Sequence, residues 1–178
     1  MQEKISCAFT GHRPQSFPWK YNETVQDCLL LKEILLKQIE KLIERGVMEF
    51  YTGLAQGVDT WAAQIVLQLR ERNPGLRLHC VLPCRDQAEN WEAVAKELHQ
   101  HIQDQADTVV TLSEKYYDGC MLVRNRYLVD HASVLLAVYN GSWRGGTAMT
   151  VRYAKKLGKE IIVINPKTRT VEYIEVKP

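Results

Sequence analysis

The sequence predicts an α/β protein built on a single doubly wound, mostly parallel sheet with helices on both faces. Short β-branched runs alternate with long amphipathic stretches along the whole chain, as in proteins made of βαβ units. Several of these runs are continuously apolar, which is typical of strands buried on both faces of a parallel sheet. The length of 178 residues fits one domain, and no repeat or linker divides 1–178.

The first half of the chain opens with a strand and a long helix. The strand is predicted at residues 5–9, where a short apolar run ends just before Thr10. The helix is predicted at 22–45 because apolar residues recur there at spacings of three and four. Asn22 is expected to be its N-cap and Gly46 its C′ residue. The next three elements, a strand, a helix and a strand, are predicted at 49–52, 58–72 and 76–82.

The second half of the chain continues the alternation of strands and helices. Residues 134–139 form a continuously apolar run that predicts a buried strand. A helix is predicted at 87–105, with one buried stripe formed by Ala88, Trp91, Val94, Leu98 and Ile102. The other elements are expected as strands at 108–112, 161–164 and 171–176, and as helices at 119–131 and 147–157.

Composition and charge exclude several classes of protein. Lys and Arg number 23 and Asp and Glu 21, so the net charge is only +2. This balance argues against a disordered polyelectrolyte and against a strongly basic nucleic-acid wrapper. No apolar run approaches the roughly 20 residues that cross a bilayer, and the N-terminus lacks the features of an export signal. We therefore expect a cytoplasmic protein that does not bind a membrane.

Cysteine usage also favours the cytoplasm. The five cysteines are odd in number and scattered along the chain, which fits reduced thiols. His79, Cys80 and Cys84 lie close together in sequence, but a strand would turn His79 and Cys80 to opposite faces. We expect no metal site and no required cofactor.

Three loops that follow predicted strands carry unusual sequence. In an open parallel sheet, ligands bind at the carboxyl ends of the strands, so these loops are the places to search. The first loop contains Gly11, which permits a sharp turn, followed by His12 and Arg13. Arginine suits bidentate contacts to phosphate or carboxylate groups. The alternative is a solvated turn with a chance basic pair.

The second loop leads from the strand at 49–52 into a helix. Gly53 and Gly57 bracket a tight turn, and the N–H groups at the following helix start favour phosphate. Leu54 and Gln56, within the turn, join the candidate ligand contacts. Asp59, near the helix start, either accepts a ribose hydroxyl or only complements the helix dipole.

The third loop follows the strand at 134–139. Gly145 and Gly146 precede a helix and build a backbone cradle for an anion, and Thr147 offers a hydroxyl or serves as an ordinary N-cap. Arg144 adds charge, while Trp143 either stacks on a base or covers the edge of the core. Because a small anion needs only a local cluster of arginines, the three loops together predict a small anionic ligand rather than a long polyanion.

One more element contributes to the same edge. The helix at 119–131 carries Arg124, Asn125 and Arg126, and residues two apart on a helix do not share a face. We therefore expect at most one of the two arginines to reach the crevice, and the other to be a solvated surface charge.

These motifs, taken in order, resemble the SLOG superfamily, and its YpsA-like branch above all. The matching segments are T-G-H-R-P, T-G-L-A-Q-G-V-D, R-N and G-G-T, and together they span nearly the whole chain. The resemblance implies a Rossmann-like fold and a nucleotide or nucleotide-derived ligand, and many members are proposed sensors. The leading hypothesis is a nucleotide, ADP-ribose or NAD-like ligand. The Gly-rich turns, Arg13 and Arg124 would hold its phosphate, Asp59 its ribose, and Trp19, Trp143 or Tyr139 its base.

Two other branches supply alternative functions. The lonely-guy phosphoribohydrolases release a base from a nucleoside monophosphate; Met121 to Arg124 is similar to their Met-x-x-Arg, which favours Arg124 over Arg126. The position of their catalytic Glu holds Thr150, which cannot supply a carboxylate. The DNA-processing protein A family, which binds single-stranded DNA, has a signature similar to residues 52–59. This chain lacks a Lys/Arg-rich stripe, so a nucleic-acid partner is not expected, and homo-oligomerisation is left open.

Overall fold

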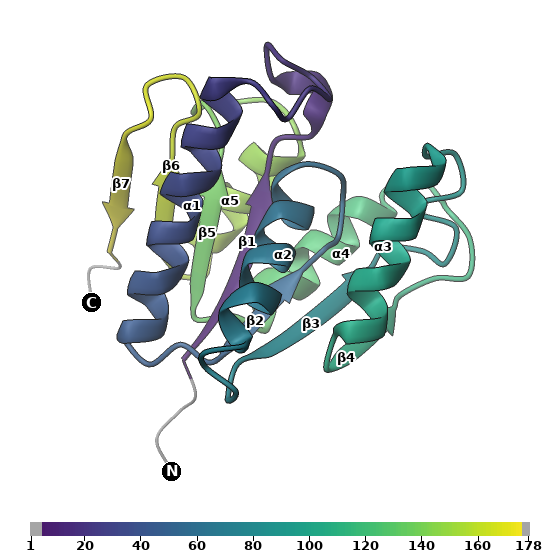
Figure 1. The fold of residues 1–178 in the computed structure, drawn as a ribbon, viewed down its shortest axis with the longest axis horizontal. Coiled ribbons are helices and arrows are strands. Elements are labelled where there is room, and N and C mark those ends of the chain that lie inside the picture. The colour runs from purple at the N-terminus through teal and green to yellow at the C-terminus, as the bar shows by residue number, and fades with distance from the viewer. Residues whose placement is uncertain (1–4, 176–178) are drawn as a thin grey trace.

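The computed structural model, which describes residues 5–175, folds the alternating segments into one sheet of seven strands. Five α-helices and a short 3-10 turn connect the strands (Figure 1). In chain order the elements are β1 (Ser6–Gly11), η1 (Pro14–Ser16), α1 (Gln26–Glu44), β2 (Glu49–Thr52), α2 (Val58–Arg70), β3 (Arg77–Leu82), α3 (Ala93–Gln105), β4 (Thr108–Thr111), α4 (Cys120–Asp130), β5 (Val134–Val138), α5 (Gly146–Lys156), β6 (Glu160–Ile164) and β7 (Val171–Ile174).

The strand order is β4-β3-β2-β1-β5-β6-β7. All neighbouring strands are parallel except β7, which runs antiparallel to β6. The chain builds the sheet outward from β1 to β4, then returns to the other side of β1 with β5. The loops after β1 and β5 therefore diverge, and such a reversal of strand order opens a crevice at the carboxyl ends of the two strands. The predicted fold class is confirmed.

Helices cover both faces of the sheet. Helices α1, α2 and α3 lie in front in Figure 1, and α4 and α5 lie behind. Successive strand residues point to opposite faces, so Phe9 packs in the core cluster under α1 and α2, and Ala8 packs in the cluster under α4 and α5. Both side chains are fully buried. The two cores hold the strand ends rigidly, and the loops that follow the strands extend from this framework.

The start of α1 differs from the prediction, and its end agrees. The Asn22 Oδ1 atom accepts hydrogen bonds from the backbone N–H and the hydroxyl of Thr24, so Asn22 forms a turn rather than the N-cap. The helix begins at Gln26. Gly46 follows the helix at φ +95°, and its N–H donates to Ile43 while that of Val47 donates to Leu42. The prediction of Gly46 as the C′ residue is confirmed.

The helix predicted at 87–105 is shorter than expected. Its helical part begins at Ala93, and backbone hydrogen bonds such as Trp91 to Ala88 form turns before it. Val94 is 78% exposed, whereas Ile102 is fully buried, so the predicted stripe is wrong over its first half. The physical reason is position: α3 packs against α2 on the side of the sheet that ends in the edge strand β4, whose residues are exposed or only partly buried.

The two ends of the chain agree with the predicted strands in part. The first strand extends to Gly11, two residues beyond the predicted end, and the last one ends at Ile174. Val176, the predicted end of the last strand, lies outside the described residues. None of the helices within residues 5–175 has the length and hydrophobicity needed to cross a membrane.

Candidate functional site

A cleft of about 560 Å³ lies at the carboxyl ends of β1 and β5, where the strand order reverses. The loops after β1, β2 and β5 and one side of α4 form its walls. Of the predicted ligand contacts, those that line it are Gly11, His12, Arg13, Asp59, Arg124, Asn125, Gly145, Gly146 and Thr147. Further lining residues that the sequence reasoning did not select are Thr10, Gln15, Ser16, Ala55, Met121, Asn140 and Ser142, together with Arg144, which was noted only for its charge.

Four predicted contacts, all in the loop after β2, do not line this cleft. The Leu54 side chain is fully buried in the core, which the sequence could not show because the turn bends it inward at φ +52°. Gln56 lines a smaller compartment next to the cleft. Gly53 and Gly57 act through the backbone around the cleft. The Gly53 carbonyl accepts a hydrogen bond from Arg124. Gly57 permits the loop after β1 to approach the start of α2 closely.

Glycine brings the loop after β1 against the start of α2. Gly57, which precedes α2, has φ +91°, and a Cβ atom there would lie 2.9 Å from the carbonyl oxygen of His12. A Cβ atom at Gly11 would lie 2.6 Å from the Val58 side chain. Real Cβ atoms do not approach other atoms this closely, so only glycine fits at both positions. This contact places His12 and Arg13 beside the first turn of α2.

His12 links the two loops that diverge at the strand-order reversal. Its backbone N–H donates to the carbonyl of Val138 at 3.1 Å. Its Nε2 atom accepts a hydrogen bond from the backbone N–H of Asn140 at 3.2 Å. Burial lowers the pKa of His12, which favours the neutral ring that this acceptor role requires. His12 thus holds the mouth of the cleft in shape as well as lining it.

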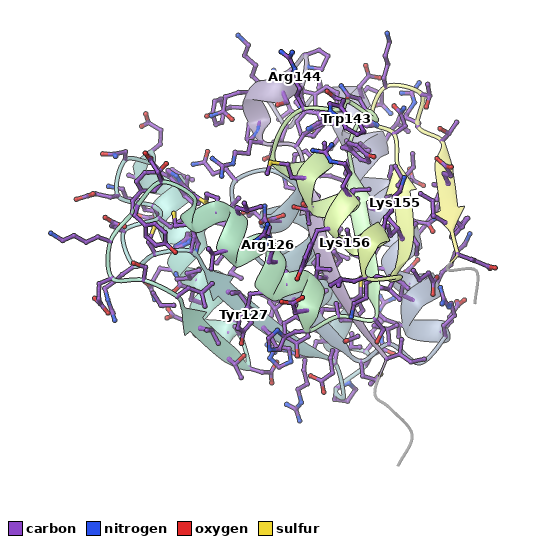
Figure 2. All side chains as sticks on the ribbon, turned by 180° about the vertical axis from the view of Figure 1, so that it is seen from behind. Arg126, Tyr127, Trp143, Arg144, Lys155 and Lys156 are labelled. Atoms are coloured by element: carbon purple, nitrogen blue, oxygen red, sulfur yellow. The ribbon has the colours of Figure 1, made fainter. Side chains whose placement is uncertain are left out.

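Arg124 is the central cation of the cleft and is only 3% exposed. Its Nη1 donates to the carbonyl of Gly53, and its Nε donates to Asn125 Oδ1 at 2.9 Å. Burial lowers the pKa of the guanidinium, and the negative charge of Asp59 opposes that effect. Arg126 instead lies over the ring of Tyr153 on the far side of α4 (Figure 2). The prediction that only one of the two arginines reaches the cleft is confirmed.

Asp59 supplies the only carboxylate among the described residues that line the cleft. It lies in the first turn of α2 and is 6% exposed. Burial raises its pKa, while Arg124 and the backbone N–H of Ala55, which donates to Oδ2 at 3.3 Å, lower it. The Thr52 hydroxyl donates to the Asp59 carbonyl and accepts from the N–H of Leu54, so the turn is fixed on both sides.

The start of α5 opens into the cleft without a side-chain cap. Gly145 occupies the N-cap position at φ +101°, and no side chain accepts hydrogen bonds from the first turn. The prediction that Thr147 could be the N-cap is therefore wrong, because it lies inside the helix. The first N–H groups of a helix lack intrahelical partners and carry partial positive charge, which suits an anion. Thr150 is buried and donates to the carbonyl of Gly146, so it takes no part in the cleft.

None of the aromatic residues considered for base stacking lines the cleft. Trp143 is 76% exposed, and the Arg152 guanidinium lies 4.4 Å from its ring centroid, so it neither covers the core nor faces the cleft (Figure 2). Trp19 stacks on Phe17, and Tyr139 lies edge-on to His12. The residue that sequence reasoning missed is Trp91. The polar residues just before it, which interrupt the apolar periodicity at the start of the predicted helix, were the signal that could have placed it in a loop.

Trp91 lines a compartment of about 80 Å³ that adjoins the cleft, together with Gln56 and Gln87. We call it the Trp91 compartment. Arg13, Gln15, Ala55 and Met121 line both spaces, so the compartment lies directly beside the cleft.

A chain of hydrogen bonds runs from α3 to the cleft. Gln103 Nε2 donates to His99 Nδ1 at 2.9 Å, and His99 Nε2 donates to Gln87 Oε1 at 3.1 Å. Gln87 Nε2 then donates at 3.1 Å to the carbonyl of Gly53, which also accepts from Arg124. The Gln103 bond fixes the tautomer of His99, because Nδ1 accepts and Nε2 must carry the proton. The side chains of α3 are thereby connected, through Gln87 and the Gly53 carbonyl, to Arg124.

His99 should make the protein sensitive to mild acid. Burial lowers its pKa from 6.5 to about 4, so the unfolded chain binds more protons between these two values. The free energy of unfolding is then expected to fall as the pH drops from about 6.5 to about 4, by at most about 1.4 kcal/mol per pH unit for one group. Urea denaturation across this range measures the slope.

A matched pair of variants isolates the contribution of His99. His99→Gln removes the group that titrates, and its unfolding free energy should depend less steeply on pH than that of the natural sequence. His101→Gln, which changes an exposed histidine of the same helix, is the matched control. Equal slopes in all three proteins would contradict the prediction.

The residues weighed for metal binding take other roles. His79 Nε2 contacts Glu49 Oε2 at 2.5 Å, and its Nδ1 contacts the hydroxyl of Thr108. Cys80 is fully buried on the opposite face of the sheet, as predicted. All five cysteines are free and buried. Across residues 5–175, no three His, Cys, Asp or Glu side chains gather closely enough to hold a metal ion.

Comparisons with known proteins agree with one another. A family model described as "YpsA: YspA SLOG family" matches residues 7–168. A UPF0398 protein of Halalkalibacterium halodurans is 30% identical over 128 residues, which cover 71% of this chain and 68% of that protein. A UPF0398 protein of Bacillus cereus strain B4264 is 28% identical over 155 residues, covering 85% and 83%. The X-ray structure of TM1055 superposes with a TM-score of 0.54 at 17% identity, covering 88% of this chain and 72% of that one; this likeness concerns the fold.

Proposed function

Because the chain belongs to the YspA SLOG family, we propose that its cleft binds a nucleotide or a nucleotide derivative of the ADP-ribose or NAD type. The observation that carries the proposal is the meeting of an uncapped helix start with three guanidinium groups. The α5 start and the side chains of Arg13, Arg124 and Arg144 all line one cleft.

Charge and size favour a small phosphate-bearing molecule. Three arginines face one carboxylate in the cleft, although the whole chain carries a net charge of only +2. Such local concentration of positive charge attracts a compact anion. A volume of about 560 Å³ falls within the range of roughly 300–1,000 Å³ that is usual for small-molecule sites. The space therefore suits a nucleotide-sized ligand.

Different walls of the cleft would contact the phosphate and the ribose of such a ligand. The N–H groups of Gly146 and Thr147 and the arginine side chains would hold the phosphate, as helix starts and guanidinium groups do elsewhere. Asp59 lies across the cleft at the start of α2, where its carboxylate could accept hydrogen bonds from ribose hydroxyls. A sensor role, as proposed for relatives, would require only binding at this site.

The alternative of N-glycosidic hydrolysis has weaker support. Asp59, whose pKa is raised by burial, is a carboxyl group that could move a proton in the cleft. However, Thr150 stands where the lonely-guy enzymes carry their catalytic Glu, and its hydroxyl bonds to the helix backbone. Binding of single-stranded DNA stays a prediction without a specific contact to support it.

A ligand panel tests the proposed function. AMP, ADP-ribose, NAD and inorganic phosphate are titrated while thermal unfolding is followed, and a nucleotide-type ligand is expected to raise the melting temperature. Arg144→Met should weaken the binding of that ligand about tenfold, because one charge-assisted contact is lost. Lys156→Met, at the far end of α5, removes an equal charge and should leave binding unchanged (Figure 2). If no compound in the panel stabilises the protein at millimolar concentration, the proposal fails.

A further inference from the structure

The Trp91 compartment differs in chemistry from the cleft that it adjoins. Within residues 5–175, no Phe, Tyr or Trp side chain lines the main cleft, whereas an indole lines the compartment. Arg13 is the one charged residue among the described residues that line the compartment, and the residues that line it but not the cleft are Trp91 and the carboxamides Gln56 and Gln87. An aromatic ring with neutral donors and acceptors suits a neutral, planar, hydrogen-bonding group rather than a second phosphate.

Gln87 is held in one orientation with part of its bonding capacity free. A carboxamide has two N–H groups and two acceptor lone pairs. One N–H is used by the carbonyl of Gly53 and one lone pair by His99. One donor and one acceptor remain on a side chain that cannot rotate without breaking both bonds. The edges of nucleobases present the complementary pair of groups side by side.

Trp91 is also held in place. Its ring meets that of His99 edge-on, with centroids 5.0 Å apart and an interplanar angle of 81°. The same histidine therefore orients both the indole and the Gln87 carboxamide. Burial keeps His99 neutral near pH 7, so this arrangement does not depend on a charge. A fixed aromatic face loses little conformational entropy when a base stacks on it, which favours binding.

We propose that the Trp91 compartment is the base-recognition subsite of the ligand whose phosphate lies at the start of α5. This inference rests on the proposed function of the main cleft. Because the compartment measures only about 80 Å³, the edge of the base enters it and the rest of the ring stays in the adjoining cleft. Stacking on Trp91 and hydrogen bonds to Gln56 and Gln87 distinguish a nucleotide from a bare sugar phosphate.

Calorimetric titration with AMP and with ribose 5-phosphate, which differ only in the base, tests the inference. The natural sequence should bind AMP at least tenfold more tightly. Trp91→Ala should weaken AMP binding between about fivefold and a hundredfold, the usual effect of losing one base–aromatic stack, and leave ribose 5-phosphate binding unchanged. Trp143→Ala, which removes an exposed tryptophan outside both spaces, is the matched control and should bind both compounds normally.

Fluorescence supplies a second readout that does not depend on the alanine variant folding. AMP should quench the tryptophan emission of the natural protein, and Trp91→Phe, which keeps an aromatic ring, should lose that quenching while it still binds AMP. Equal affinities for AMP and ribose 5-phosphate, no AMP binding at millimolar concentration, or quenching that persists in Trp91→Phe would overturn the inference. The proposed function is decided separately by the full panel, which includes NAD and ADP-ribose.

Discussion

Replacing Arg124 by methionine is expected to lower the free energy of unfolding by about 3 kcal/mol and to weaken the binding of a phosphate-bearing ligand at least tenfold. The Arg124 guanidinium is buried, and its positive charge stabilises the negative charge of the Asp59 carboxylate. Without it, the Gly53 carbonyl and Asn125 Oδ1 each lose a donor. The buried carboxylate then keeps only the weaker cationic influence of Arg13, and leaving a buried charge so poorly compensated is more costly than the loss of a surface ion pair.

The neighbouring arginine provides the control for this experiment. Arg126→Met removes the same group from the same helix, but Arg126 lies over Tyr153 outside the cleft. Urea denaturation should show a loss of well under 1 kcal/mol for it, and calorimetry an unchanged ligand affinity. Adding Asp59→Asn to Arg124→Met should recover part of the stability, since the unpaired charge disappears. If Arg124→Met and Arg126→Met behave alike, the role assigned to Arg124 is wrong.

Replacing Gly57 by alanine is expected to lower the free energy of unfolding by about 3 kcal/mol. Its backbone, at φ +91° and ψ −129°, lies in a region that is nearly restricted to glycine. The added methyl would also lie 2.9 Å from the His12 carbonyl, which belongs to backbone and cannot rotate away. The loop after β1 would have to separate from α2, and the cleft would lose the placement of Arg13.

Gly46→Ala provides the comparison for this loss. Gly46 has a similar φ of +95°, but a Cβ atom there would meet nothing within 4 Å. Its cost should be that of the backbone strain, about 1 kcal/mol. Both variants are measured by chemical denaturation, and the difference of about 2 kcal/mol reports the close approach at Gly57 together with its more restricted backbone conformation. Equal losses at the two positions would show that the approach of the loops has no energetic weight.

Periodicity and motif placement predicted the sheet and most of the cleft, because both depend on local signals. The apolar runs specified buried parallel strands, and helical geometry together with the Met-x-x-Arg pattern selected Arg124 over Arg126. The predicted ends of helices were less certain where the same residue type can form either a helix cap or a turn. Asn22 can cap a helix or close a turn with the same oxygen, and only the surrounding chain decides between them.

The part of the site that the sequence did not predict depends on contacts between distant segments. Nothing in the local sequence shows which way the Leu54 side chain points within the loop after β2, yet it is buried in the core. Trp91 fits the helical stripe by spacing, yet it lies before α3, in a segment where Gln87 donates a hydrogen bond to the Gly53 carbonyl. Such bonds join residues more than thirty positions apart, and no local pattern encodes them.

The position of β5 beside β1 has a consequence for the time at which the cleft forms. The central pair of the sheet aligns Cys7 with Val134, and Ser6 bonds to Ser133 across 127 residues of chain. A ribosome that synthesises this protein therefore releases β1 well before β5, the strand that pairs with it at the centre of the sheet. Closing so long a loop is slow relative to local helix formation. During synthesis, the cleft can therefore form only after β5 and the start of α5 have emerged.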